Sequence, residues 1–243
     1  MTTSAGERGF ILHSRPYSET SALVDILTAS QGRIRAVARG ARRKGQQPLQ
    51  PFCEFWLNWH GRSDLKTLRQ AESSGRVYRL LGDALYAGLY ANELLVRLLE
   101  PEAPSVMLFS AYSRLLEQLA DAPRNLSPAL RALEGALLAE LGYGQDVLAH
   151  EAGGAPLNTD RFYRWDWTQG WLPAPDGTGY PGSVLLAMAQ GDYSDPALEK
   201  WARRLYREWL DSLLGSRPLR SRELYKAYKE KQHASSRPAR GQH

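Results

Sequence analysis

Between Asp25 and Glu54 every charged side chain is basic, and this stretch has the composition best suited to bind a polyanion. Arg33, Arg35 and Arg39 alternate along an expected strand and therefore share one face of it. Arg42, Arg43 and Lys44 follow in a loop that also contains Gly40, Gly45 and Pro48. Such a patch repels itself, and a nucleic-acid backbone is the commonest partner that compensates the charge. A solvated basic loop that serves solubility is the alternative.

Further side chains extend this expected nucleic-acid surface. Lys66 and Arg69 flank it from a later strand, and Arg15 and Tyr17 lie in the turn after the first strand. Single-strand binders combine such a cationic track with aromatic platforms, for which Tyr17, Trp56 and Trp59 are candidates. For Trp56 and Trp59 we expect core packing instead. Because nothing here is suited to reading base edges, we expect little sequence preference.

Catalytic and metal-binding patterns are absent from the sequence. The histidines show no metal-binding spacing, and there is no HExxH, GxSxG, GxxxxGK[ST] or GxGxxG motif. The single cysteine, Cys53, excludes an intramolecular disulfide and a Cys-rich zinc cluster, and we expect it to be a buried structural thiol. We therefore predict a protein that is not an enzyme.

The expected nucleic-acid residues lie on a series of short strands. Strands are expected at 10–12, 22–27, 33–39, 52–59 and 65–71, with turn residues between them. Five short strands in so short a segment predict a small closed barrel, with the OB-fold as the leading candidate and an SH3-like barrel as the competitor.

From residue 82 the hydrophobic period becomes helical. Helices are expected from 82 to about 100, over 105–119, 127–141, 183–190 and 196–214, and over about 220–230. Glycines, prolines and aromatic residues at about 143–182 indicate an irregular insert with one hairpin at 161–172, whose aromatic cluster we interpret as a small core. The predicted fold class is α+β: an OB-fold barrel over 1–81, an all-helical domain over 82–230 and a disordered basic tail over 231–243.

Charge is segregated along the chain in the same way. Residues 1–81 have a net charge of +7, residues 82–215 of −8 and residues 216–243 of +6. No apolar run is long enough to span a membrane, and the N-terminus lacks a signal-peptide core. We expect a soluble cytoplasmic protein with basic surfaces at both ends of the chain.

Several segments together resemble the RecO family of bacterial recombination mediators. They are FILHSRPYSETSALVDILTASQGRIRAVARGAR at 10–42, LQPFCEF at 49–55, LKTLRQAE at 65–72, LYAGLYANELL at 85–95, LGYG at 141–144 and LGSRPLRSREL at 214–224. The resemblance covers almost the whole chain. It implies an OB-fold followed by a helical domain, and a bacterial, nucleoid-associated protein of the RecF pathway.

The resemblance also implies activities and partners. The family binds single- and double-stranded DNA, anneals complementary strands, acts with RecR and loads RecA onto DNA coated by single-stranded DNA-binding protein (SSB), whose acidic C-terminal tail it contacts. Many members carry four zinc-binding cysteines after LGYG. Residues 145–190 contain none here, so we expect no cofactor and suggest that tryptophan packing replaces the metal.

An acidic tail that ends in an apolar residue needs an apolar groove with a cation at its rim. Arg131 is the first candidate for this carboxylate partner, with an ion pair to Glu134 as its alternative role, and Arg97 and Arg114 are the next candidates. Arg217, Arg220 and Arg222 form a possible secondary DNA surface, or else bind carbonyl groups and acids of the helical domain.

Two other functions fit the same residues. One is an RNA-binding OB-fold protein, and the other is an adaptor whose basic surfaces meet acidic protein tails. Equal affinity for single-stranded RNA and DNA would favour the first, and tight binding of an acidic peptide with weak nucleic-acid binding would favour the second.

Overall fold

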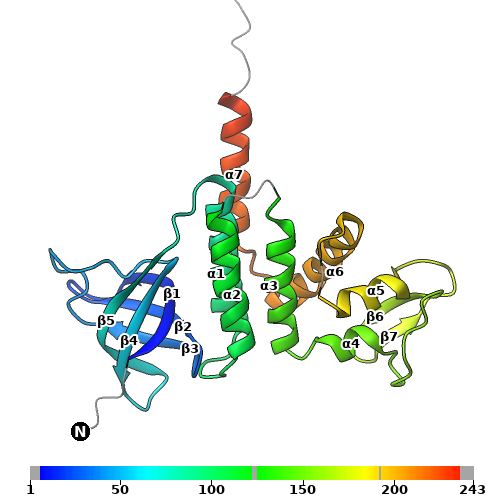
Figure 1. The fold of residues 1–243 in the computed structure, drawn as a ribbon, viewed down its shortest axis with the longest axis horizontal. Coiled ribbons are helices and arrows are strands. Elements are labelled where there is room, and N and C mark those ends of the chain that lie inside the picture. The colour runs from blue at the N-terminus through cyan, green and yellow to red at the C-terminus, as the bar shows by residue number, and fades with distance from the viewer. Residues whose placement is uncertain (1–5, 122–124, 192, 236–243) are drawn as a thin grey trace, which may run out of the picture.

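The computed structural model describes residues 6–121, 125–191 and 193–235 and arranges them as three bodies in a row (Figure 1). A barrel lies at one end, a bundle of helices lies in the middle, and a mixed segment with a small sheet lies at the other end. The last helix rises from the middle of this row, away from its long axis.

The barrel consists of β1 (Glu7–Pro16), β2 (Ala22–Thr28), β3 (Gly32–Ala38), β4 (Cys53–His60) and β5 (Leu65–Val77). The strands close in the order β1-β2-β3-β5-β4, with β3 and β5 parallel and the other pairs antiparallel. This topology confirms the predicted OB-fold. Strand β5 extends beyond the expected residue 71 to Val77.

Alternation along the strands separates the inside of the barrel from its outside. Ile34, Ala36 and Ala38 of β3 are buried, as are Val24 and Ile26 of β2, and they form one core with other barrel residues. Arg33 and Arg35 take the opposite face of β3, as the two-residue period requires.

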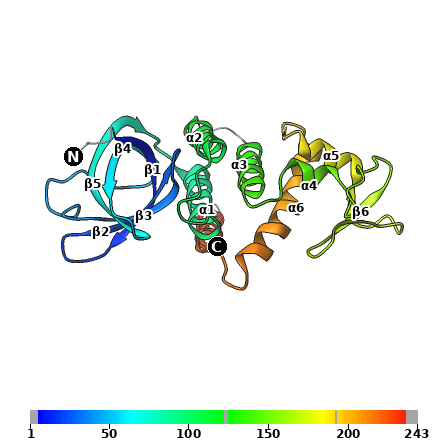
Figure 2. The same ribbon diagram turned by 90° about the horizontal axis from the view of Figure 1, so that it is seen from below.

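The helical bundle packs directly against the barrel. It contains α1 (Gly82–Leu98), α2 (Val106–Ala120) and α3 (Ser127–Glu140), followed later by α6 (Pro196–Leu214) and α7 (Arg220–Ser235). Seen from below, α1 and α2 lie next to the barrel and α3 lies on their far side (Figure 2). Phe10 of β1 contacts Phe109 and Tyr112 of α2, with ring centroids 5.4 and 5.2 Å away.

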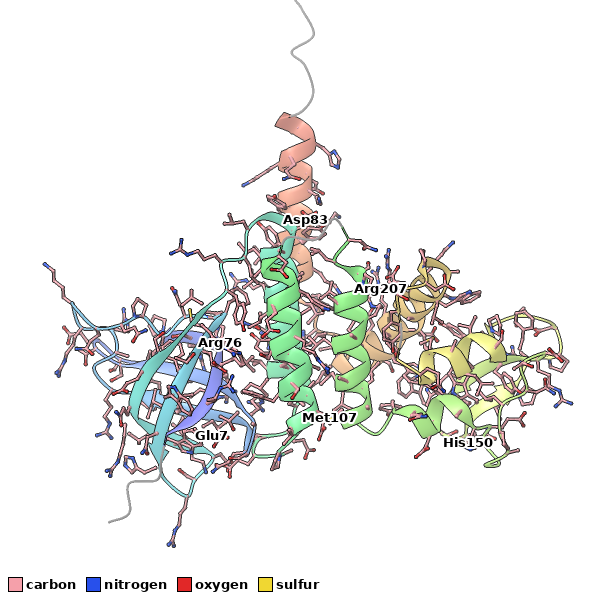
Figure 3. All side chains as sticks on the ribbon, in the orientation of Figure 1. Glu7, Arg76, Asp83, Met107, His150 and Arg207 are labelled. Atoms are coloured by element: carbon pink, nitrogen blue, oxygen red, sulfur yellow. The ribbon has the colours of Figure 1, made fainter. Side chains whose placement is uncertain are left out.

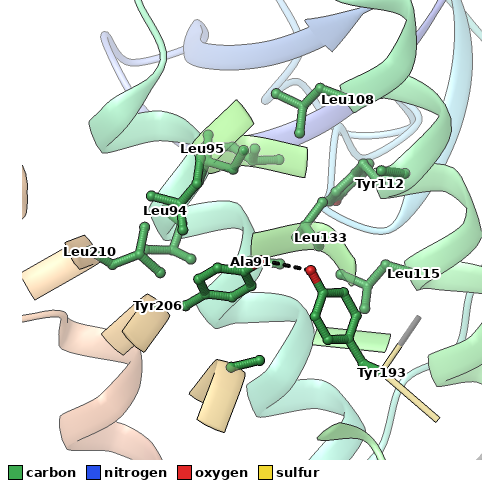
Figure 4. Close-up of a cluster of buried hydrophobic side chains, with 14 of the residues drawn as sticks. Ala91, Leu94, Leu95, Leu108, Tyr112, Leu115, Leu133, Tyr193, Tyr206 and Leu210 are labelled. Atoms are coloured by element: carbon green, nitrogen blue, oxygen red, sulfur yellow. Dashed lines mark hydrogen bonds between the residues drawn. The ribbon is translucent and has the colours of Figure 1, made fainter. Parts of the chain in front are cut away.

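The core of the bundle joins residues distant in sequence. Leu94 and Leu95 of α1, Leu115 of α2 and Leu133 of α3 meet Leu210 of α6 in one buried cluster (Figure 4). Tyr193 and Tyr206 lie at its edge, where their hydroxyl groups are 2.6 Å apart. Phe10 and Leu12 of the barrel belong to this same cluster, so one core spans both domains.

The segment expected to be irregular has more structure than predicted. It contains α4 (Gln145–Ala149) and a sheet of β6 (Phe162–Asp166), β7 (Gly170–Pro173) and β8 (Tyr180–Pro181). The next element, α5 (Gly182–Ala189), agrees with the helix expected at 183–190. The pairing of β6 with β7 agrees with the predicted hairpin. The tail, expected to be disordered from residue 231, is helical through Ser235, and residues 236–243 lie outside the described residues.

Aromatic rings form the core of this segment, as expected. Trp165 lies 5.2 Å from Trp171 and 4.7 Å from Trp209 of α6, measured between ring centroids. Trp171 and Trp209 are fully buried. The burial is uneven, because Phe162 and Trp167 are 37% and 43% exposed.

Candidate nucleic-acid interface

Two adjoining hollows follow the outer face of the barrel between two of its loops. One has a volume of about 420 Å³ and the other of about 310 Å³, and both have Tyr17 and Leu65 in their walls. Tyr17 belongs to the β1–β2 loop, and Leu65 follows the β4–β5 loop. We call the two hollows together the barrel groove; its walls also include Arg35, Arg39 and Arg43. OB-folds bind oligonucleotides on this face.

Local hydrogen bonds fix the loops around the groove. The Arg42 guanidinium donates to the carbonyl oxygens of Ser18 and Glu19 at 2.6 and 3.2 Å, and its backbone N–H donates to Thr20 at 3.0 Å. Gly40 adopts a positive φ of 72°, and the Arg43 N–H donates to its carbonyl oxygen at 3.0 Å. The Arg42 side chain thus joins the basic loop to the β1–β2 loop while keeping its charge.

Arg39 and Arg43 are the exposed cations of the barrel groove. Arg35 lines it as well, but its Nε is 3.1 Å from the buried carboxylate of Asp25, which offsets part of its charge. Tyr17 is 57% exposed, as expected for an aromatic platform. Arg15 and Lys44 are exposed nearby in the chain but do not line the groove.

Two of the predicted DNA contacts, Arg33 and Lys66, line the barrel groove but are buried and held by partners within the protein, so a phosphate contact for them stays a prediction that their burial disfavours. The Arg33 side chain is 8% exposed, donates to the Leu99 carbonyl at 3.1 and 3.0 Å, and pairs with Asp25 at 3.2 Å. Burial lowers the pKa of this guanidinium, although Asp25 opposes the shift. Alternation placed Arg33 on the outer face correctly, but the segment between α1 and α2 covers that end of β3.

The Lys66 side chain is 6% exposed, and its Nζ lies 2.6 Å from Glu102. Lys66 shares the buried face of β5 with Leu68, whereas Leu65 and Arg69 are exposed, although Lys66 still lines one hollow of the barrel groove. Arg69 is exposed but lies outside the groove and donates to His60 Nδ1 at 2.9 Å. Asp25 and Glu102 are the acidic residues whose presence could have indicated that Arg33 and Lys66 form ion pairs within the protein.

The two tryptophans of β4 differ from each other. Trp59 packs against the barrel core, as expected. Trp56 was also expected in the core but is 47% exposed. It pairs with Arg8 of β1 and Glu72 of β5, on the side of the barrel away from β2 and β3.

In the helical bundle, a separate hollow of about 420 Å³ lies between α1, α3, α6 and α7, and Arg131 lines it. Arg131 is buried, and its guanidinium lies 2.5 Å from Glu134 and 3.5 Å from Glu199, so the alternative role as an ion pair is present. Burial would lower the pKa of Arg131, but the carboxylate of Glu134 outweighs it and raises the pKa. Two buried polar atoms here, Arg131 Nε and Glu134 Oε2, have no hydrogen-bond partner.

The rim of this hollow, which we call the α3 cavity, carries more cations. The side chains of Arg203 and Arg207 are 56% and 71% exposed, and Leu126 and Leu130 supply apolar wall. Arg207 of α6 and Asp83 of α1 both line this hollow, and both are labelled in Figure 3. Sequence reasoning missed Arg203 and Arg207 because they lie on α6, far from Arg131 in the chain.

The other two candidates for tail binding have different surroundings. Arg97 donates to the carbonyl oxygens of Leu214, Arg217 and Pro218 at 3.1, 2.7 and 3.0 Å, and so holds the turn between α6 and α7. Arg114 is exposed and lines a groove of about 710 Å³ between α2 and α3, on the other side of α3 from Arg131.

The secondary basic surface is partly committed to structure. Arg222 pairs with Asp211 and lies over the Tyr90 ring at 5.5 Å, while Arg217 and Arg220 are exposed. Glu93 accepts from the N–H groups of Arg220 and Ser221 at 2.9 and 2.8 Å and thereby fixes the start of α7.

Within residues 6–121, 125–191 and 193–235, no group of three or more His, Cys, Asp or Glu side chains could hold a metal ion. Among these residues, too, no helix combines the length and the apolar composition that crossing a membrane would require.

Comparison with known proteins agrees with a chain made of a barrel followed by a helical domain. The family model described as recombination protein O, N terminal, matches residues 1–76, and the model of its C terminal matches residues 79–223. The chain belongs to the RecO family. The boundary between the two RecO models falls at the end of β5, where the barrel ends and α1 is about to begin.

Curated RecO proteins are similar over nearly the whole chain. One from Pseudomonas paraeruginosa is 46% identical over 95% of this chain and 98% of its own length. Others from Haemophilus influenzae and Yersinia pestis are 43% and 39% identical, over 90% and 96% of this chain and 94% and 98% of their own lengths. Each is named DNA repair protein RecO. This RecO chain therefore has a role in DNA repair and recombination.

Proposed function

We propose that this RecO chain binds single- and double-stranded DNA through the barrel groove and anneals complementary strands. The observation that carries the proposal is the pair of exposed arginines, Arg39 and Arg43, beside Tyr17 in a groove bounded by two OB-fold loops. Backbone phosphates bind the guanidinium groups, and a base stacks on the tyrosine. Base pairing supplies the free energy of annealing, so the protein needs no nucleotide hydrolysis and is not an enzyme.

The test of the groove is the double variant Arg39→Glu/Arg43→Glu, measured by fluorescence anisotropy with a labelled oligonucleotide. Loss of two phosphate contacts to a single strand lowers the slope of log K against log salt by about 1.4, about 0.7 for each contact. The matched control is Arg161→Glu/Arg164→Glu, which makes the same charge change at exposed positions of the β6 region. Unchanged affinity in the folded groove variant would refute this site.

We further propose that the α3 cavity binds the acidic C-terminal tail of SSB, as the family resemblance implies. Arg203 and Arg207 at the rim meet carboxylates, and the wall of Leu126 and Leu130 meets the apolar terminal residue. Arg131, first expected to bind the carboxylate directly, mainly positions Glu134 and Glu199. With RecR, the chain then helps load RecA onto SSB-coated single-stranded DNA, in the bacterial cytoplasm at the nucleoid.

A tail peptide titrated into two variants separates the two candidate grooves. Arg203→Glu/Arg207→Glu is expected to weaken peptide binding at least ten-fold, whereas Arg114→Glu, on the other side of α3, leaves it unchanged. The opposite result would move the tail site to the groove between α2 and α3. Tight peptide binding combined with weak DNA binding would favour the adaptor function, and equal affinity for RNA and DNA would favour the RNA-binding function.

A further inference from the structure

Helix α7 joins an excess of positive charge to a cluster of tyrosines. Over Arg220–Ser235 it has five Lys or Arg residues and two Glu residues, and the chain beyond it adds Arg237 and Arg240. Lys226 and Lys231 are exposed. The far end of α7 projects from the body of the molecule, as Figure 1 shows.

The tyrosines lie where α7 packs on α1. Tyr86 of α1 contacts Tyr225 and Tyr228 of α7, with ring centroids 5.6 and 4.6 Å away, and the two α7 rings stack at 6.4 Å. Tyr225 is 36% exposed. Each α7 tyrosine has a lysine one helical turn further on: Lys229 after Tyr225, and Lys231 after Tyr228.

Ion pairs with the helical bundle neutralise only some of the basic residues of α7. Lys229 pairs with Asp83 at 2.8 Å and Arg222 pairs with Asp211, and both contacts hold α7 to the bundle. Lys226 and Lys231 take no part in the ion pairs found among the described residues. A tyrosine platform bordered by cations is the arrangement that binds single-stranded nucleic acid without sequence preference.

We infer that the α1–α7 tyrosine cluster, with Lys226 and Lys231, is a second binding surface for a single nucleic-acid strand. This inference rests on the proposed function, because annealing requires one protein to hold two strands whose phosphates repel each other. The barrel groove holds the first strand. The α7 surface, on a different body of the molecule, holds the second strand and raises the local concentration of the pair.

The experiment counts bound strands on the full chain by native mass spectrometry. Oligonucleotides of about eight nucleotides lie within the size range of one single-strand site. The wild type is expected to bind two, Lys226→Glu/Lys231→Glu one, and Arg39→Glu/Arg43→Glu one. Both variants are expected to anneal complementary strands at least ten-fold more slowly, whereas the control Arg161→Glu/Arg164→Glu retains two strands and normal annealing.

Cross-linking checks the tyrosines themselves. Irradiation of the wild type with a bromouracil-substituted oligonucleotide is expected to modify Tyr225 or Tyr228 in addition to Tyr17. Two strands on the Lys226→Glu/Lys231→Glu variant, or cross-links confined to the barrel, would overturn the α7 surface while leaving the groove intact. A loss of SSB-tail peptide binding, with two strands retained, would instead assign α7 to a protein partner. No strand on the wild type would refute the proposed function itself.

Discussion

At the scale of single residues, two arginines that lie close together in the chain have different roles because only one of them is buried against partners within the protein. Arg33 and Arg39 lie on the same face of one strand, yet Arg33 is buried against Asp25 and the Leu99 carbonyl, while Arg39 is exposed in the barrel groove. A buried guanidinium with these partners supports the fold, because removing it leaves polar groups without hydrogen bonds.

We expect the two residues to separate stability from binding. Arg33→Met should lower the free energy of unfolding by about 3–5 kcal/mol, since it breaks a buried ion pair. Arg39→Met should change it by no more than about 0.5 kcal/mol and should weaken DNA binding instead. Urea unfolding followed by tryptophan fluorescence measures the first quantity, and equal destabilisation by both changes would contradict this assignment.

Glu93 makes the attachment of α7 sensitive to acid. Burial alone would raise the pKa of this carboxyl, but hydrogen bonds from the Ser221 hydroxyl and from the N–H groups of Ser221 and Arg220 outweigh it and lower the pKa. A lowered folded-state pKa adds stability that is complete above the unfolded value, about 4.3, and is lost as the pH falls through the folded value.

The free energy of unfolding of the wild type should therefore fall more steeply below about pH 4.3 than that of Glu93→Gln. At pH 7 the variant should be the less stable of the two. Urea unfolding at a series of pH values between neutral and acid gives both curves. Parallel curves would mean that Glu93 has no such role.

At the scale of elements, the segment between α3 and α6 is held together by aromatic rings. Trp165, Trp171 and Trp209 pack on one another with Tyr143 at their edge. Trp209 comes from α6, so this core also joins the segment to the helical bundle.

We expect the aromatic core of this segment to be stable without a bound metal. Trp209→Ala should lower the free energy of unfolding by about 3–5 kcal/mol, as for other large aromatic residues truncated in a core. Prolonged treatment of the wild type with a strong zinc chelator should leave its Tm unchanged. A Tm that falls on chelation and recovers with zinc would show that a metal is bound after all.

Sequence periodicity predicted most of these elements and failed where a distant segment intervened. Alternation identified the faces of β3, but no local pattern shows that residues 99–103 return to cover Arg33. The helix expected from residue 196 begins there, and Asp195 caps it by accepting from the Ala197 N–H at 2.8 Å. The helix expected from residue 127 also begins there, but the Ser127 hydroxyl accepts from Arg203 at 2.8 Å and does not cap the helix.

At the scale of the whole molecule, the barrel and the helices share a buried polar link. Asn92 of α1 donates to the Leu12 carbonyl of β1 at 2.8 Å and accepts from the Tyr112 hydroxyl of α2 at 2.6 Å. No local pattern in the sequence indicates this partner of Asn92, because Leu12 is a backbone contact 80 residues away. The same holds for the candidate site. The sequence allowed its basic residues to be recognised, but it did not show which distant residues pair with them.

The shared core predicts one cooperative unfolding transition for barrel and bundle. Asn92→Ala should lower the free energy of unfolding by about 1–3 kcal/mol, because it leaves two buried polar groups unpaired. Calorimetry of the wild type should show a single peak, and the variant should shift that peak without splitting it. Two separate peaks in the wild type would show that the domains unfold independently.

The closed barrel also bears on solubility in crowded conditions. Each of its strands is hydrogen-bonded on both sides, since β1 pairs with β4 and β3 with β5 to complete the ring. Open sheet edges are where copies of a protein join into aggregates. Copies of this chain that are crowded at a local density far above that in free solution therefore have no free barrel edge through which to aggregate.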